Sequence, residues 1–250
     1  MNVKPSPYEF LGPPLAMTRG NVTASVTDEL RRAIVTLALK PGETLDKGAI
    51  CERLGVSRFP VSEALARLQT EGLVDIAPQR GSTVSLVRLW DVAEYMLIRK
   101  ALEAEAVRVS CGDQSGDLLE ALEANLEAQR DAVARDDRET FHGHDVDFHD
   151  LLFTGMRFGK IKTAIEGARA NLDRARRLII TPRRIAYSLA EHQAIYEALR
   201  RNDSGGAVAA MRAHIDSVMA EVFDMARDHP ELFADSGERP PLGRDDFPFG

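Results

Sequence analysis

Four side chains in the second half of the chain have the types and spacing of a divalent metal site. Asp145 and His149 stand four residues apart in HDVDFHDLL, so on a helix they lie about 40° apart around the axis and one turn along it. His192 and His214 each fall on the apolar stripe of a later helical segment. Three imidazoles and one carboxylate from three helices would suit Zn²⁺, Ni²⁺ or Mn²⁺.

The same residues have a simpler interpretation, in which each histidine is a core side chain with an ordinary hydrogen-bond partner. For any single histidine that interpretation is the better one. Only the convergence of three on one bundle favours a metal, and the pattern by itself leaves both interpretations open. His142, three residues before Asp145, could compete as a ligand. His144 faces away from the stripe, and His229 lies in the C-terminal tail.

Helices must position these side chains, because 90–228 has helical apolar spacing throughout. The pattern is interrupted at CGDQSGD, RDD, GMRFG, TPRR and RNDSGG. We therefore expect helices at about 90–110, 115–135, 137–155, 158–180, 184–202 and 205–228. Antiparallel helices of this length form a bundle, whose interior is a usual place for metal and ligand sites.

The segment 23–87 has a different pattern, of three helices followed by two short strands. Pro41-Gly42 and Gly55 end the first two helices, and Arg80-Gly81 provides a tight turn between the strands. This order is that of a winged helix-turn-helix domain. We expect its second and third helices at 46–54 and 57–72, and its strands at 73–77 and 83–87.

Composition excludes several classes of protein. The chain has 250 residues, 44% hydrophobic and 28% charged, with a net charge of −7, which is enough apolar content for one large or two modest domains. No apolar run approaches the roughly 20 residues of a membrane span. The Pro-rich start lacks the pattern of a signal peptide, and two cysteines favour a reduced cytoplasm. We expect 1–22 and 229–250 to be a flexible arm and a flexible tail.

The winged helix-turn-helix pattern predicts DNA binding, because the third helix of that fold enters the major groove and the wing touches the backbone. Arg58 can make two hydrogen bonds to guanine, and Ser57 or the helix N-terminus can hold a phosphate. The charge balance argues against DNA binding, because 23–86 carries eight basic and eight acidic residues whereas nucleic-acid binders usually have a basic face. A local basic face would nevertheless be sufficient for binding. The predicted surface comprises Lys47, Ser57, Arg58, Phe59, Pro60, Ser62, Glu63, Arg80 and Gly81.

Three motifs follow one another within 26–87: LKPGETL, LGVSRFPVSEALARLQTEGLV and PQRGSTV. Together they resemble the GntR family of bacterial transcription regulators, and the resemblance implies a winged helix-turn-helix that binds an operator. Two positions depart from the family pattern. Ser62 replaces a common arginine, and Asp46-Lys47-Gly48 stands where an acidic residue followed by arginine is frequent. The resemblance therefore does not extend to the family's usual operator half-site.

The second half carries WDVAEYMLIRKALEAEAV, Asp-x-x-Phe-His at 145–149, Glu-His at 191–192 and, further on, His214. Over about 90–225 this resembles the FCD effector domain of the FadR subgroup. The resemblance implies that Asp145, His149, His192 and His214 bind a metal at the floor of a cavity. It also implies that Arg99 meets an anionic effector there, since a guanidinium beside a metal suits a carboxylate. The alternative for Arg99 is an ion pair with Glu103 at i+4.

The sequence thus predicts a mainly α protein, in which an N-terminal winged helix-turn-helix is followed by an all-α antiparallel helix-bundle effector domain. We expect a cytoplasmic, homodimeric transcription regulator, a repressor in the commoner family behaviour, that binds a palindromic double-stranded operator under control of a small carboxylate at a metal site. The alternative is a metal-dependent hydrolase or isomerase with a helical accessory domain. The chain has no HExxH, GxSxG, P-loop or GxGxxG motif, so we do not expect an enzyme.

Overall fold

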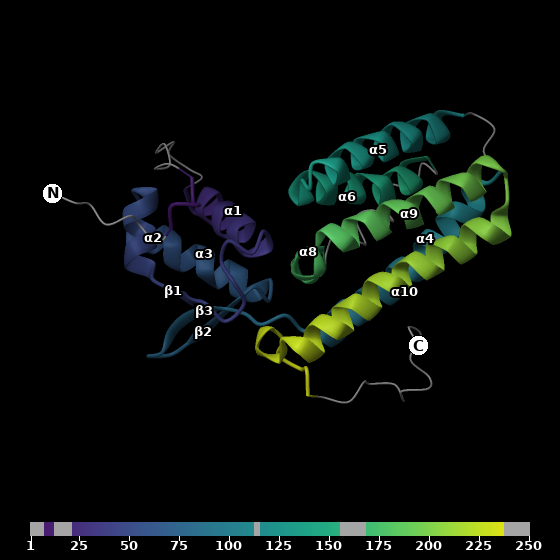
Figure 1. Ribbon diagram of the computed structural model, residues 1–250. Helices are drawn as coiled ribbons and strands as arrows, with labels where there is room; N and C mark the ends of the chain where they lie inside the picture. The colour runs from purple at the N-terminus through teal and green to yellow at the C-terminus, as the bar shows by residue number, and fades with distance from the viewer. Residues whose placement is uncertain (1–7, 13–21, 113–115, 156–168, 238–250) are drawn as a thin grey trace. The chain divides into compact units, whose positions relative to one another are not determined.

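The computed structural model describes residues 8–12, 22–112, 116–155 and 169–237 of the chain. The elements fall into two compact units, whose helices and strands are labelled in Figure 1. The first unit runs to Arg88 and also includes His229–Ala234, whereas the second comprises Leu89–Asp228 and continues from Asp235. The mainly helical fold predicted from the sequence is confirmed.

The first unit has the elements of a winged helix-turn-helix. Three helices, α1 (Val22–Val35), α2 (Lys47–Leu54) and α3 (Arg58–Thr70), accompany the strands β1 (Thr44–Leu45), β2 (Val74–Ala77) and β3 (Gly81–Val84). The strands form one antiparallel sheet in the order β1-β3-β2, and β2 and β3 make the wing. The second wing strand begins earlier than expected, at Gly81 rather than Thr83, because pairing starts directly at Ala77 and Gly81.

Local sequence explains how the helices of this unit begin and end. Val26, Leu30 and Ile34 form the buried stripe of α1. The Asp46 carboxylate caps α2 by accepting hydrogen bonds from the backbone N–H groups of the second and third helical residues. Gly55 ends α2 with a φ of +66°, a left-handed conformation that glycine adopts without a steric penalty.

Part of the predicted N-terminal arm is packed rather than flexible. Tyr8 and Leu11 are buried, and the Tyr8 hydroxyl accepts a hydrogen bond of 2.8 Å from the Asp46 backbone N–H. The Arg53 guanidinium donates to the carbonyl oxygens of Tyr8 and Leu11. Two large apolar side chains and one multidentate donor on α2 therefore hold the segment 8–12, which Pro-rich composition does not reveal.

The beginning of the predicted C-terminal tail is also ordered. Pro230–Leu232 forms a short 3-10 helix, η1, and Phe233 is buried. The Val87 N–H donates to the Leu232 carbonyl and the Ala234 N–H donates to the Val87 carbonyl, both at 2.9 Å, which makes a parallel bridge. The expectation of a flexible tail from 229 onward is wrong for these residues, because one aromatic side chain and two backbone hydrogen bonds anchor a segment of low apolar content.

The second unit is a bundle of long helices. The helix expected at 158–180 is described only from Arg169 onward, and the rest of it lies outside the described residues. The other helices begin and end within a few residues of the expected positions. The helices are α4 (Leu89–Ser110), α5 (Asp117–Ala134), α6 (Arg138–Gly155), α8 (Arg169–Ile179), α9 (Pro182–Arg200) and α10 (Ser204–Asp228).

Packing within the bundle places α10 along both α4 and α9, while α5 packs against α6 and α9. Local signals help to start two of these helices. The Thr181 hydroxyl accepts a hydrogen bond from the Arg184 N–H and Pro182 occupies the first position of α9. At α4, the Asp235 carboxylate accepts hydrogen bonds from the Leu89 and Trp90 N–H groups at 2.7 and 3.2 Å. Over the described residues, no helix is long and apolar enough to cross a membrane.

Candidate functional site

The four predicted metal ligands meet inside the bundle. Asp145 and His149 come from successive turns of α6, His192 from α9 and His214 from α10. All four are buried, and one ligand atom from each lies within 4.8 Å of the ligand atoms of the others. The helical spacing of the first pair and the apolar stripes that carry the other two therefore bring one carboxylate and three imidazoles to a single point.

The distances between the donor atoms suit a metal ion. His149 Nε2 and His214 Nε2 are 3.3 Å apart, and His192 Nε2 is 3.6 Å from Asp145 Oδ1. A tetrahedral ion with bonds of about 2.1 Å separates its ligand atoms by about 3.4 Å. His192 Nε2 is buried without a hydrogen-bond partner, which a core histidine would normally have.

The other ring nitrogen of each histidine lies near an acceptor, and those of His192 and His214 are hydrogen-bonded to it. His149 Nδ1 lies 2.7 Å from Glu103 Oε2, and His214 Nδ1 donates to Glu191 Oε2 at 2.8 Å. His192 Nδ1 donates to Gln129 Oε1, also at 2.8 Å. The two hydrogen bonds put the proton of His192 and His214 on Nδ1 and leave the Nε2 lone pair directed at the centre, and the carboxylate beside His149 Nδ1 favours the same tautomer there.

A chain of amides fixes the orientation of Gln129. Its Nε2 donates to Asn125 Oδ1 at 2.7 Å, and Asn125 Nδ2 in turn donates to the His144 carbonyl at 3.0 Å. The Gln129 oxygen is therefore the atom that remains for His192. Phe148 stacks on the His192 ring, with centroids 4.3 Å apart, so packing and hydrogen bonding together hold this imidazole in one orientation.

Burial sets the charge state of the cluster. It lowers the pKa of His149, and it lowers the pKa values of His192 and His214 well below the ordinary value, because a charged imidazole loses its hydration there. The histidines are consequently neutral, the form that binds metal. Burial alone would raise the pKa of Glu103, but Arg99 and His149 outweigh it and the net shift is downward, so this carboxylate is ionised.

Each carboxylate around the cluster is paired with an arginine. Arg176 contacts Asp145, Arg184 contacts Glu191, and Arg99 Nε donates to Glu103 Oε1 at 2.5 Å. These pairs balance the negative charge that the ligand set and its neighbours bring into the interior. A divalent cation would add two positive charges to this balanced set, which makes the surroundings of a bound metal favourable for an anion.

The DNA-binding surface predicted on the first unit is mostly exposed. Ser57, Arg58, Phe59, Ser62, Glu63, Arg80 and Gly81 are exposed, and Lys47 is half-buried. Ser57 precedes α3 as its N-cap, yet its side chain makes no capping hydrogen bond, so the hydroxyl is available to a phosphate. Pro60 is expected on this surface but is buried, because it lies on the inner face of α3 with Ala64 and Leu68, four and eight residues further along the helix.

Comparison with known proteins decides the family. Residues 22–84 match the family described as bacterial regulatory proteins, gntR family, and 94–217 match the FCD domain. A Streptomyces ambofaciens protein, named as an HTH-type transcriptional regulator in an unstable DNA locus, is 32% identical over 92% of this chain and 98% of its own length. The chain belongs to the GntR family. The HTH-type transcriptional repressor RspR of Escherichia coli is 31% identical over 82% of this chain and 91% of its own.

Solved structures show the same fold. A GntR regulator from Rhodococcus sp. RHA1 superimposes with a TM-score of 0.68 at 24% identity, covering 82% of this chain and 99% of its own. McbR/YncC of E. coli superimposes with a TM-score of 0.65 at 24% identity, covering 81% of this chain and 97% of its own. This GntR-family protein is a transcription regulator with an FCD effector domain, and not an enzyme. Regulators of this family bind DNA operators.

Two arginines line a small cavity beside Asp145, and Arg99, the predicted effector contact, is not among its lining residues. Arg176 and Arg184 line a cavity of about 20 Å³ together with Asp145 and Ser188, whereas Arg99, which is paired with Glu103, does not line it. Burial lowers the pKa of Arg176 to about 9, and the neighbouring arginines add to this; it remains charged at neutral pH. In the sequence, Arg176 belongs to the run DRARR at 173–177 and Arg184 to TPRR at 181–184, and neither run shows which arginine points inward.

His142, the other candidate ligand, lies outside the ligand set. It is buried on α6 and lines the same cavity, but its Nε2 faces Asp173 Oδ1 at 4.0 Å. His142 is three residues from Asp145, and its side chain therefore points about 60° away from that of Asp145 around the helix axis. The convergence at the centre involves Asp145 and His149 instead.

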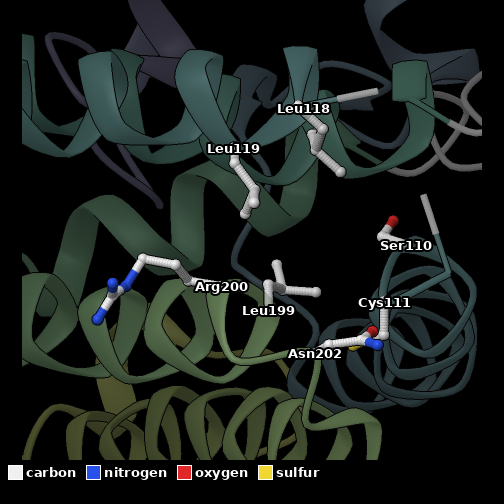
Figure 2. A pocket seen from close by; sticks show the side chains of 8 residues that line it. Ser110, Cys111, Leu118, Leu119, Leu199, Arg200 and Asn202 are labelled. Atoms are coloured by element: carbon white, nitrogen blue, oxygen red, sulfur yellow. The ribbon is translucent and has the colours of Figure 1, made fainter. Parts of the chain in front are cut away.

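A larger pocket of about 320 Å³ lies at one end of the bundle, lined by Ser110, Cys111, Gly116, Leu118, Leu119, Leu199, Arg200 and Asn202. Figure 2 shows Leu118 and Leu119 on one side and Leu199, Cys111 and Asn202 on the other. Leu199 follows His192 by seven residues, about 10 Å along α9, so this pocket is separate from the ligand set. Burial raises the pKa of the Cys111 thiol, which makes it a poor nucleophile.

Proposed function

We propose that this regulator holds Zn²⁺, Ni²⁺ or Mn²⁺ on Asp145, His149, His192 and His214. The observation that carries the proposal is the convergence of three neutral imidazoles and one carboxylate on a buried point. With an acceptor near each Nδ1, three lone pairs and a negative oxygen face one another. A cation stabilises that arrangement, whereas without one the donor atoms repel each other. When bound, the ion offers a positive centre to a carboxylate oxygen of an effector.

A small organic acid beside this centre is proposed to control DNA binding. Arg176 and Arg184 line the cavity next to Asp145, and a guanidinium can hold a carboxylate through two parallel hydrogen bonds. We assign the direct contact to these two arginines. All three arginines are paired with a carboxylate, but Arg99 does not line this cavity, and we assign it the role of holding Glu103 beside His149.

The size of the cavity suggests how the effector acts. A volume of about 20 Å³ holds one water molecule, so an organic acid must open the site in order to bind. Such a ligand has unequal affinity for the closed and open arrangements. This inequality is what allows a ligand to shift the population that binds DNA.

Operator binding is proposed for a homodimer acting as a repressor. A two-fold dimer presents its two recognition helices to the half-sites of a palindrome, and the exposed face of α3 with the wing would be the contact surface. Two relatives, RspR of E. coli and NanR of Cronobacter sakazakii, are named transcriptional repressors. Relief of repression by the organic acid is the expected response.

Thermal unfolding of chelator-stripped, full-length protein tests the metal site. A metal ion at about 100 times its Kd should stabilise the protein by about 2.7 kcal/mol, a rise of roughly 5–10 °C in Tm for a unit of this size. His192→Ala should abolish this rise and lose the bound metal in elemental analysis. His142→Ala is the matched control, because it truncates a buried histidine outside the ligand set and should keep the metal.

Two results would overturn the proposal in separate ways. If none of the three ions raises the Tm of the wild-type protein, the histidines are core side chains and not metal ligands. Full metal content in His192→Ala would remove His192 from the site. On metal-loaded protein, a panel of small carboxylates should give a further rise in Tm, which Arg176→Met should lose while keeping the response to metal. If Arg176→Met keeps both responses, the effector binds elsewhere.

A further inference from the structure

The most exposed of the large hydrophobic side chains in the described part of the chain is Phe59, which is 72% exposed. It stands in the first turn of α3, directly after Arg58 and before the buried Pro60. An aromatic ring left in water at such a position contributes little to folding, because burial is what makes it stabilising. Its place on the face that meets DNA suggests that DNA covers it.

The neighbours of Phe59 limit what this face can recognise. Ser62, Glu63 and Ala66 are exposed at three, four and seven residues from Phe59, so all four side chains lie on one face of α3 within about 100°. The only guanidinium at this end of the helix is that of Arg58, because Ser62 replaces the arginine common in the family. This face therefore has few hydrogen-bond donors for guanine and one large apolar group.

The major groove offers one apolar feature to such a group. Its base edges carry hydrogen-bond donors and acceptors, and the sole exception is the C5-methyl group of thymine. A phenyl ring has no hydrogen bond to give to a base edge. It can lie against a methyl group, and both apolar surfaces then leave water.

The geometry points to Phe59 as a specificity-determining residue that reads a thymine methyl group in each operator half-site. This inference rests on the proposed contact of α3 with the operator. It adds a base preference that the family pattern does not supply, at a position next to the guanidinium of Arg58. The operator half-site should accordingly contain a thymine whose methyl group is needed for full affinity.

Deoxyuridine substitution tests the inference, because it removes only the methyl group and leaves base pairing intact. The probe is the duplex selected by the full-length protein from a random-sequence library, with each thymine replaced in turn. For the wild-type protein, one thymine in each half-site should be sensitive, and its replacement should weaken binding about fourfold, the value of one apolar carbon removed from contact. Phe59→Ala should weaken binding of the unmodified duplex and abolish the sensitivity at that thymine. Phe59→Leu, which keeps an apolar side chain, should retain part of it.

The control variant is Tyr187→Ala on α9, which truncates an aromatic side chain that is 50% exposed in the second unit. It should bind the duplex as the wild type does and keep the sensitive thymine. Circular dichroism should show Phe59→Ala as folded and as stable as the wild type, because the ring is exposed. Selection of no duplex by the wild-type protein would contradict operator binding itself. A duplex with no sensitive thymine, or with the same sensitivity in Phe59→Ala, would overturn the role of Phe59 alone.

Discussion

Replacing Glu103 by glutamine should show how far the proposed metal centre depends on groups beyond its ligands. Glu103 is 1% exposed and Arg99 is 4% exposed, with Arg99 Nε 2.5 Å from Glu103 Oε1 and His149 Nδ1 2.7 Å from Glu103 Oε2. Glutamine preserves the shape and one acceptor oxygen but removes the charge. The Arg99 guanidinium is then buried without its counter-ion.

The magnitude follows from the burial of this pair. Removing one partner of a buried ion pair costs about 3–5 kcal/mol, which corresponds to a fall of roughly 6–20 °C in the Tm of a unit of this size. Loss of a carboxylate behind a metal-binding histidine lowers metal affinity about 10–100-fold. Thermal unfolding of the metal-free protein at pH 7.5 measures the first effect, and titration with Zn²⁺ measures the second.

A control on the same helix separates burial from charge. Glu105 forms an ion pair with Arg108 at 2.5 Å, but both side chains are more than half exposed. Glu105→Gln should therefore leave the Tm and the metal affinity unchanged, because exposed pairs contribute little. The double variant Arg99→Met/Glu103→Leu should recover most of the stability lost in Glu103→Gln, since no unpaired buried charge remains.

A Glu103→Gln protein that melts within about 1 °C of the wild type would contradict a destabilising unpaired charge on Arg99. A double variant that is less stable than Glu103→Gln would contradict it as well. Either result would mean that water or another group compensates Arg99. If Tm falls as expected but metal affinity is unchanged, Glu103 stabilises the bundle without orienting His149.

Three further predictions concern the helix start, the histidine cluster and the DNA surface. Asp235→Ala removes the two hydrogen bonds that cap α4 and should cost about 1–2 kcal/mol in urea unfolding; an unchanged midpoint would show that the cap is replaced by water. Metal-free protein should lose stability as the pH falls below about 6.5. Burial lowers the pKa values of His192 and His214 in the native state, so the unfolded chain takes up protons that the native state does not. Thermal scans from pH 8 to 5 measure this loss, and a Tm that does not change with pH would contradict it. Arg58→Ala should weaken operator binding at least tenfold by loss of a bidentate base contact, with helicity and metal content unchanged; equal binding in a gel shift would exclude Arg58 from the interface.

Local geometry is what sequence alone determined about this protein. The turn of an α-helix sets the angle between neighbours, so the spacing of Asp145 and His149 was enough to predict that they share a face. Motif order along 26–87 was enough to predict the winged helix-turn-helix. The helix ends at Pro41-Gly42 and Gly55 likewise follow from short-range backbone preferences.

Inter-helix packing decided the rest, because it brings together residues that no local rule relates. Gln129 and His192 are 63 positions apart, and only the contact between α5 and α9 makes one the acceptor of the other. The pair of Arg99 with Glu103 was visible in the sequence as an i+4 spacing. The sequence does not show whether this pair lies in water or in the core, and breaking a buried pair costs far more stability than breaking an exposed one.

Inter-helix packing also decides which arginine side chains face the interior of the bundle. Nothing in DRARR shows which side chain faces the interior, because the orientation of α8 depends on its contacts with α4 and α10. The ends of the chain show the reverse error, since composition favoured flexible segments where Tyr8 and Phe233 are buried. A single side chain that finds a pocket can order a segment, and whether the pocket exists is a property of the folded protein and not of the segment.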